Sequence, residues 1–262
     1  MAQLAREFDI VSVHPRAAAR SLVTSDLVVV RNSGPVAGYP EAYAEFRERA
    51  LASGARVYNE LSGRADMRGK LYLLELFGAG FPVIPTATPG AIDTLPPTPG
   101  YVAKPVHGAD SIGLAFLSPD DAAAFDAPGM LLQPRIEMRA ELSFVFVDHE
   151  YQYALTTTPG LERWELCLHE ASDDDLAFAR RFIEWNDMRH GIQRVDACRT
   201  PDGELLLVEL EDLNPYLSLD LLDDPARTRF VAAFTAALHR VLAASQSAMG
   251  PRSSRSSARR PG

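Results

Sequence analysis

A turn flanked by two strand-like runs, in the last third of the chain, constrains the fold more than any other feature. Residues 194–215 read RVDACRTPDGELLLVELEDLNP, in which TPDG separates RVDAC from LLLVELE. Pro, Asp and Gly favour tight turns, and β-type runs on both sides of such a turn indicate a hairpin. Because side chains alternate along a strand, Glu209 and Glu211 are predicted to project to one face, and Val208 and Leu210 to the other.

The same hairpin gathers acidic residues. Asp196, on the first run, lies across the turn from the second, so the carboxylates of Asp196, Glu209 and Glu211 are predicted on one sheet face, with Arg194 beside them. Like charges this close repel one another unless a cation offsets them. Oxygen ligands without His or Cys suit Mg²⁺ or Mn²⁺. The other interpretation is the solvated polar face of an antiparallel hairpin.

Composition narrows the classes of partner. The 262 residues are 47% apolar and 23% charged, which is ordinary for a soluble globular protein. The net charge of −9 argues against nucleic acid as a partner. No apolar run approaches the ~20 residues of a membrane helix, and the first residues lack the pattern of a signal peptide. We therefore expect a soluble, cytoplasmic protein that has no membrane partner, and a homodimer is compatible with the sequence.

Several motifs, in a consistent order along the chain, resemble those of a known family. R-x-D, E-x-E and N-P within residues 194–215 resemble the metal-binding signature of the ATP-grasp superfamily. Asp196 and Glu209 stand thirteen residues apart, a spacing also seen in D-alanine–D-alanine ligases. The likeness covers about residues 22–222 and is greatest to the glutathione-synthetase-like branch, which includes the cycloserine-forming cyclo-ligase. It implies an α/β fold of α+β lobes with a shortened N-terminal α/β subdomain.

The resemblance also implies the domain limits. They are a shortened N-terminal subdomain at 1–65, a first ATP-grasp lobe at 66–132, a second lobe with the metal-binding hairpin at 133–245, and a disordered tail at 246–262. The apolar runs 8–13 and 27–31 are predicted to be buried parallel strands. Apolar periodicity predicts helices over 39–53, 173–185 and 226–244.

Four residues of the first lobe match family positions that contact nucleotide phosphates. Lys70 matches the lysine of a D-K motif that opens a helix, and Lys104 matches the lysine of V-x-K-P. Gly108 and Gly113 belong to the loop that follows, whose backbone N–H groups can cradle phosphate. Two departures stand out, because Gly69 replaces the aspartate before Lys70 and the loop keeps only two glycines.

The resemblance assigns the rest of the ATP site and the catalytic cations. Gln133 and Ile136 lie in a strand similar to the adenine hinge, and Glu137 is placed to reach the ribose hydroxyls. Arg163 matches the arginine of a G-D-x-R element that assists phosphoryl transfer, and Arg194 is the second catalytic cation.

Three further residues are implied to contact substrate: Arg31, Glu141 and Asn214. Arg31 follows the strand-like VVV run, where related ligases carry an arginine that faces the substrate. A surface arginine at the end of a strand is the alternative interpretation.

The implied activity is that of an ATP-dependent carboxylate–amine or cyclising ligase. It uses ATP with Mg²⁺ or Mn²⁺, and it acts through an acyl phosphate on an amino acid or a small peptide-like substrate. Its partners are then a small-molecule carboxylate and an amine. Two alternatives stay open. One is a nucleotide-binding module with little or no turnover, favoured by the departures from the family pattern, and the other is a small-molecule kinase on the same fold.

Overall fold

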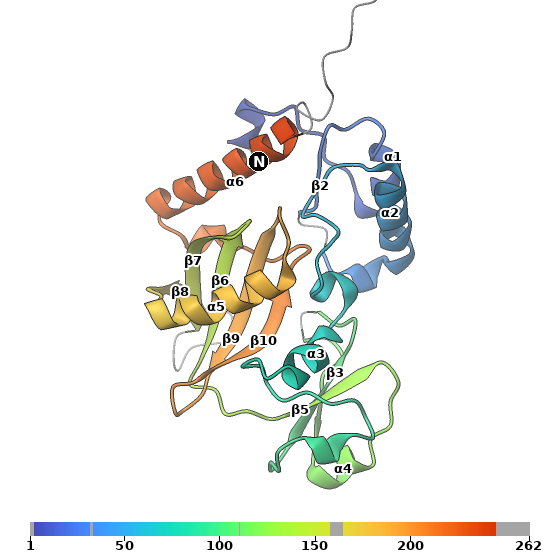
Figure 1. The fold of residues 1–262 in the computed structure, drawn as a ribbon, viewed down its shortest axis with the longest axis vertical. Coiled ribbons are helices and arrows are strands. Elements are labelled where there is room, and N and C mark those ends of the chain that lie inside the picture. The colour runs from blue at the N-terminus through green and yellow to red at the C-terminus, as the bar shows by residue number, and fades with distance from the viewer. Residues whose placement is uncertain (1–2, 32–33, 110, 158–164, 245–262) are drawn as a thin grey trace, which may run out of the picture.

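The computed structural model describes residues 3–31, 34–109, 111–157 and 165–244 (Figure 1). The predicted tail at 246–262 and the predicted catalytic residue Arg163 lie outside the described residues. The described helices are α1 (Ala18–Ser21), α2 (Pro40–Ser53), α3 (Tyr72–Gly78), α4 (Pro119–Ala123), α5 (Asp173–Asn186) and α6 (Asp224–Ala244).

The described strands form sheets of two, three and five strands. The strands are β1 (Val28–Val29), β2 (Val57–Tyr58), β3 (Tyr101–Pro105), β4 (Ala115–Leu117), β5 (Met130–Pro134), β6 (Ala140–Val147), β7 (Glu150–Thr157), β8 (Leu166–His169), β9 (Ile192–Arg199) and β10 (Leu205–Glu211). The largest sheet is antiparallel, in the order β10-β9-β6-β7-β8, and the next is antiparallel in the order β4-β3-β5. The predicted domain limit between residues 132 and 133 falls inside β5.

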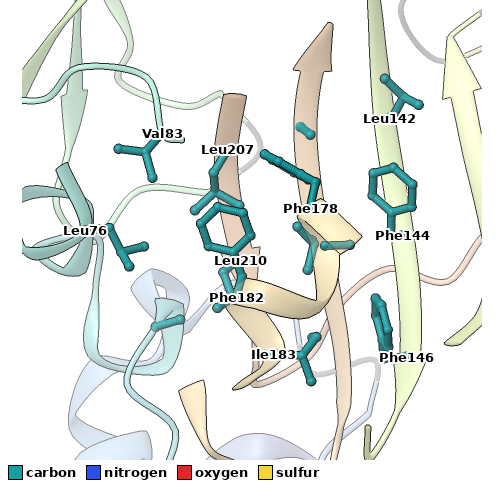
Figure 2. Packing of buried hydrophobic residues seen from close by; sticks show 14 of the residues in the cluster. Leu76, Val83, Leu142, Phe144, Phe146, Phe178, Phe182, Ile183, Leu207 and Leu210 are labelled. Carbon is teal, nitrogen blue, oxygen red and sulfur yellow. The ribbon is translucent and has the colours of Figure 1, made fainter. Parts of the chain in front are cut away.

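The five-stranded sheet is covered on both faces, and the alternation of β6 shows why. Phe144 and Phe146 pack with α5 in one apolar cluster, to which Phe182 also belongs (Figure 2). Val145 and Val147 point the other way and belong to a second cluster, with residues of α6. Because both faces of the strand are buried, β6 is apolar along most of its length, and the sheet is a rigid support for residues at its β10 edge.

Helix α5 starts and stops as its sequence predicts. The hydroxyl of Ser172 accepts the backbone N–H of Asp175 at 3.2 Å, and the Asp175 carboxylate accepts the Ser172 N–H at 3.1 Å, which together form a capping box. The helix ends at Asp187, whose φ of 54° is left-handed. The predicted helix over 173–185 is confirmed.

The hairpin of β9 and β10 is confirmed, but its alternation is interrupted. Glu209 pairs with Asp196 and Glu211 with Arg194, while the register shifts between Leu207 and Glu209. The extra residue, Val208, is a β-bulge.

The bulge changes which faces the side chains occupy. It lets Leu207 and Leu210 both face the α5 core although they are three residues apart (Figure 2). Val208 and Glu209 both line the cleft described below. The prediction that Val208 shares the face of Leu210 is therefore wrong, because strict alternation does not hold across a bulge.

The three-stranded sheet joins the five-stranded sheet through the segment around α3. Val83 forms a parallel bridge with Leu207 of β10. The hydroxyl of Tyr72, in α3, accepts the backbone N–H of Leu210 at 2.7 Å. These two contacts hold the start of α3 and the segment after it against the edge strand that carries Glu209.

The N-terminal unit is smaller than its sequence predicts. β1 and β2 pair in parallel, and α1 and α2 contact one another beside them (Figure 1). The strand predicted at 27–31 is confirmed in part, since β1 is parallel but spans only two residues, and these are half-buried and not buried. The strand predicted at 8–13 is wrong, because this run forms no strand and Val11 is 78% exposed. Among the described residues, no helix is long and apolar enough to cross a membrane.

Candidate functional site

A cleft of about 250 Å³ lies between the three-stranded sheet and the β10 edge of the five-stranded sheet. Its lining includes predicted residues from both sheets and from the segment between them: Lys70, Lys104, Gly108, Gln133, Ile136, Glu141 and Glu209. The sequence therefore identified, without a structure, side chains that the fold brings together from positions up to 139 residues apart (209 minus 70).

The chain has two lysines, and both line this cleft. Lys70 is 4% exposed and Lys104 is 8% exposed, although lysine is almost never buried unless it is paired. The Nζ atom of Lys70 contacts Asp66 Oδ2 at 2.6 Å and forms an ion pair with Glu209. The cleft therefore holds two buried ammonium groups beside the carboxylates of Glu209 and Glu141.

Asp66 is a residue that sequence reasoning missed. The family aspartate before the lysine is replaced by Gly69, and Asp66 supplies a carboxylate to Lys70 from one turn earlier. No helical spacing predicts this contact, because the short 3₁₀ helix ends at Arg68 and Gly69 turns the backbone before Lys70.

Gly69 is required at its position. Its φ is +89°, and a Cβ there would lie 2.6 and 2.7 Å from Cε1 and Nδ1 of His107. The imidazole of His107 thus packs against the backbone just before Lys70, in the room that a side chain at position 69 would need. This contact accounts for the departure from the family pattern.

We expect Gly69→Ala to lower the free energy of unfolding by about 1–3 kcal/mol, because an alanine there is strained and collides with His107. Gly80→Ala is the matched control, since Gly80 also has a positive φ, +75°, but has open space where its Cβ would be. Urea denaturation of both variants, each with and without His107→Ala, measures the contact. His107→Ala should restore part of the free energy of unfolding lost in Gly69→Ala and none of that lost in Gly80→Ala. Equal restoration in the two variants would contradict this account.

The loop after Lys104 is tight for a reason visible at its glycines. A Cβ on Gly108 would lie 3.2 Å from Pro105 Cβ, and one on Gly113 would lie 2.9 Å from Pro105 Cγ. Gly113 also has a φ of +80°. Both predicted glycines therefore let the loop fold back onto Pro105, while Asp110 lies outside the described residues.

Two of the three residues predicted to contact adenosine line the cleft, and the third does not. Gln133 is 3% exposed and donates from Nε2 to Thr86 Oγ1 at 2.8 Å, and Ile136 also lines the cleft. Glu137 is exposed and is not among the lining residues. Phe116, which sequence reasoning missed, lines the cleft and is 70% exposed. An exposed aromatic side chain at a cleft can stack on a planar ring, although the guanidinium carbon of Arg135 already lies 5.7 Å from the centroid of this one.

The carboxylates of the hairpin are held by Arg194. Its Nη2 atom lies 2.8 Å from Asp196 Oδ2 and 3.0 Å from Glu211 Oε1, and its Nη1 donates to the Tyr216 carbonyl at 2.7 Å. Ser143 donates its hydroxyl to Asp196 Oδ1 at 2.7 Å. Arg194, Asp196 and Glu211 thus share one face, as predicted, with Glu209 opposite Asp196 in the register.

Burial and close charges shift the pKa values of this group. Although 27% of its side chain is exposed, burial raises the pKa of Glu211 to about 7, opposed by Arg194 and reinforced by Asp196. Burial disfavours the charged guanidinium of Arg194, but the carboxylates of Asp196 and Glu211 outweigh this and raise its pKa.

The donor set agrees in chemistry with the predicted metal. Asp196, Glu209 and Glu211 supply only carboxylate oxygens, which are the ligands that Mg²⁺ and Mn²⁺ prefer. Within the described residues, however, no group of three His, Cys, Asp or Glu side chains is arranged to hold a metal ion. Asp196 and Glu211 are paired with Arg194, whereas Glu209 is paired with Lys70. The metal site stays a prediction.

The predicted substrate residues do not share one cavity. Glu141 lines the cleft, and its backbone is held by hydrogen bonds of 3.0 Å with the Thr156 and Thr157 hydroxyls. Arg31 lines a second cavity, described below, and donates to the Pro215 carbonyl at 2.8 Å. Asn214 is half-buried just before that carbonyl.

Asp212 is the second residue that sequence reasoning missed. It is fully buried, and its two carboxylate oxygens accept the backbone N–H groups of Met67 at 2.8 Å and Ala65 at 2.9 Å. The Asn186 amide donates to it at 3.3 Å. The Asp212 carboxylate therefore fixes the turn that carries Asp66.

The fold is similar to that of several solved structures. It matches the D-cycloserine synthetase DcsG with a TM-score of 0.67 and 23% identity, over 87% of this chain and 93% of that one. It matches a RimK domain ATP-grasp protein from Sphaerobacter thermophilus with a TM-score of 0.60 and 20% identity, over 89% and 90% of the two chains. It matches the ATP-grasp ligase PsnB, complexed with a precursor variant, Mg and ADP, with a TM-score of 0.54 and 18% identity, over 76% and 69%.

Neither a family model nor a curated protein matches the chain by sequence. The structural likeness shows that the chain has the ATP-grasp fold, and the predicted fold class is confirmed.

Proposed function

We propose that the chain is an ATP-dependent ligase that joins a carboxylate to an amine through an acyl phosphate. The observation that carries this proposal is the burial of both lysines of the chain in the cleft, opposite Glu209 of the edge strand. Burial of two ammonium groups is costly unless anions accompany them, and Lys70 has the carboxylates of Asp66 and Glu209 as partners. The triphosphate of ATP is an anion of suitable charge for the same cleft.

The reaction requires two displacements. An oxygen of the substrate carboxylate attacks the γ-phosphorus of ATP, the bond from that phosphorus to the β–γ bridging oxygen breaks, and ADP leaves. The nitrogen of the amine then attacks the carbonyl carbon of the acyl phosphate, the bond to the phosphate oxygen breaks, and the amine loses a proton. Lys70 and Lys104 neutralise phosphate charge, and positioning contributes most of the rate.

Asp196, Glu209 and Glu211 would hold Mg²⁺ or Mn²⁺, which supplies positive charge to the phosphates when it is bound. Arg194 holds Asp196 and Glu211 in place meanwhile, at 2.8 and 3.0 Å. Glu141, Asn214 and Arg31 are the substrate contacts in this proposal, and Gln133 and Ile136 are the contacts of the base.

We expect Lys104→Met to weaken Mg·ATP binding by about tenfold or more, the scale of a lost charge-assisted hydrogen bond. Methionine keeps most of the apolar stem, so the fold should persist. Calorimetric titration with Mg·ATP measures the change, with Arg180→Met on the exposed side of α5 as the control for loss of a cation. Unchanged affinity in Lys104→Met would mean that Lys104 does not contact ATP.

ADP release, measured with and without amines over a panel of amino acids, separates the candidate activities. A ligase releases ADP with acid and produces an amide only when the amine is present. A kinase acting on a hydroxyl releases ADP without an amine and yields no acyl phosphate that hydroxylamine can trap. Binding of Mg·ATP without ADP release under any condition would favour a nucleotide-binding module.

A further inference from the structure

A second cavity, of about 110 Å³, lies in the N-terminal unit between β1 and α2. Its walls are largely apolar and aromatic, and they include Val29, Val30, Tyr39, Tyr43, Phe46 and Leu213. Among the described residues, it shares no lining residue with the cleft that contains the lysines. The contacts proposed for ATP therefore do not involve this cavity, which contains one of the proposed substrate contacts, Arg31.

Arg31 is the cation in this lining. Its Nη2 donates to the Pro215 carbonyl at 2.8 Å, whereas its Nη1 is buried and has no hydrogen-bond partner among the described residues. A buried guanidinium donor without an acceptor is costly, and a carboxylate is the acceptor whose planar geometry matches it. Arg31 thus has the chemistry to bind an acid at the cavity.

The cavity adjoins the hairpin that carries the predicted metal ligands. Leu213 lines it, two residues after Glu211, and the Arg31 guanidinium is tied to Pro215, four residues after Glu211. An acid bound to Arg31 would therefore lie beside the catalytic hairpin and not at a remote surface.

We propose that this cavity is the subsite for the acid substrate, and that it selects a small branched aliphatic carboxylate, with the carboxylate on Arg31 and the alkyl group against Val30 and Phe46. The inference rests on the proposed ligase function. The size sets the class, because a cavity of about 150 Å³ accepts benzene and a smaller one accepts a shorter alkyl group.

The test uses three probes on the full chain: isovalerate, acetate and 3-methylbutylamine, with affinities from saturation-transfer NMR. Isovalerate should bind at least tenfold more tightly than acetate, since each buried CH₂ contributes about fourfold. The amine, which has the same five-carbon skeleton with an ammonium group in place of the carboxylate, should not bind. Equal binding of isovalerate and acetate, or binding of the amine, would overturn the proposal.

Two variants locate the binding. Ala18 lines the cavity, so Ala18→Leu should fill it and weaken isovalerate binding by about tenfold or more, while Ala52→Leu, on the exposed side of α2, should leave it unchanged. Arg31→Met should weaken isovalerate and acetate alike, and it provides a second measurement if Ala18→Leu does not fold. If folded Ala18→Leu or folded Arg31→Met binds isovalerate as tightly as wild type does, this cavity is not the binding site.

Mg·ATP titrations of the same samples test the ligase proposal separately from the subsite proposal. Wild-type protein that binds Mg·ATP but not isovalerate would refute the subsite alone. Protein that binds isovalerate at this cavity but not Mg·ATP would support the acid site and refute the ligase.

Discussion

Glu209→Gln is expected to abolish ligase activity and most of the stabilisation that Mg·ATP gives to the wild-type protein. Glu209 is the carboxylate of the β10 edge that lines the cleft, and it forms an ion pair with Lys70. A ligand that binds the native state raises the melting temperature by mass action, so weaker binding appears as a smaller shift. Glutamine keeps the volume of the side chain and removes its charge.

The same substitution should have a smaller, separable effect without nucleotide. Lys70 is 6% exposed at its side chain and retains Asp66 as a partner, so the loss of Glu209 should cost about 1–3 kcal/mol of the free energy of unfolding. The control is Glu204→Gln, an exposed residue of the same hairpin. Thermal melts of the three proteins with and without Mg·ATP decide the matter. Equal nucleotide-induced shifts in wild type and Glu209→Gln would refute the assignment of Glu209.

Much of this site could be predicted because the residues that form it lie in short local patterns. Lys104 is next to the last residue of β3 and precedes a glycine-containing loop, and Glu209 follows a turn whose sequence predicts a hairpin. Local rules of turn and strand therefore placed each of them on the correct kind of element. The family resemblance supplied what local rules cannot, namely that Lys70, Lys104 and Glu209 meet in one cleft.

The parts that were wrong or missed depend on contacts between distant segments. Val208 was assigned to the wrong face because no local sequence pattern predicts the β-bulge. The bulge depends on the packing of Leu207 and Leu210 against α5. Residues 8–13 have the composition of a strand but find no partner strand in the structure. Asp212 looked like one more acid in an acidic run, because its backbone partners lie 145 and 147 positions away.

Asp212→Ala is expected to lower the free energy of unfolding by about 2–5 kcal/mol, which is the largest stability effect that we predict. The carboxylate accepts two backbone N–H groups, from Ala65 and Met67, in a site with no exposure to water. Each buried donor left without an acceptor costs about 1–3 kcal/mol. The free energy of unfolding of Asp212→Asn should lie between those of wild type and Asp212→Ala, since an amide offers one acceptor oxygen where the carboxylate offers two. Asp220→Asn, at an exposed position, should change stability by less than about 0.5 kcal/mol.

The effect on nucleotide binding distinguishes a positioning role from a purely structural one. Ala65 and Met67 flank Asp66, which holds Lys70 at 2.6 Å, so the turn that Asp212 anchors also sets the position of a cleft lysine. We therefore expect folded Asp212→Asn, measured well below its melting temperature, to bind Mg·ATP about tenfold more weakly than wild type. In an Asp66→Asn background the further loss from Asp212→Asn should be much smaller, because the two residues act through the same lysine. Independent, additive losses in this double-mutant cycle would mean that Asp212 stabilises the fold without positioning Lys70.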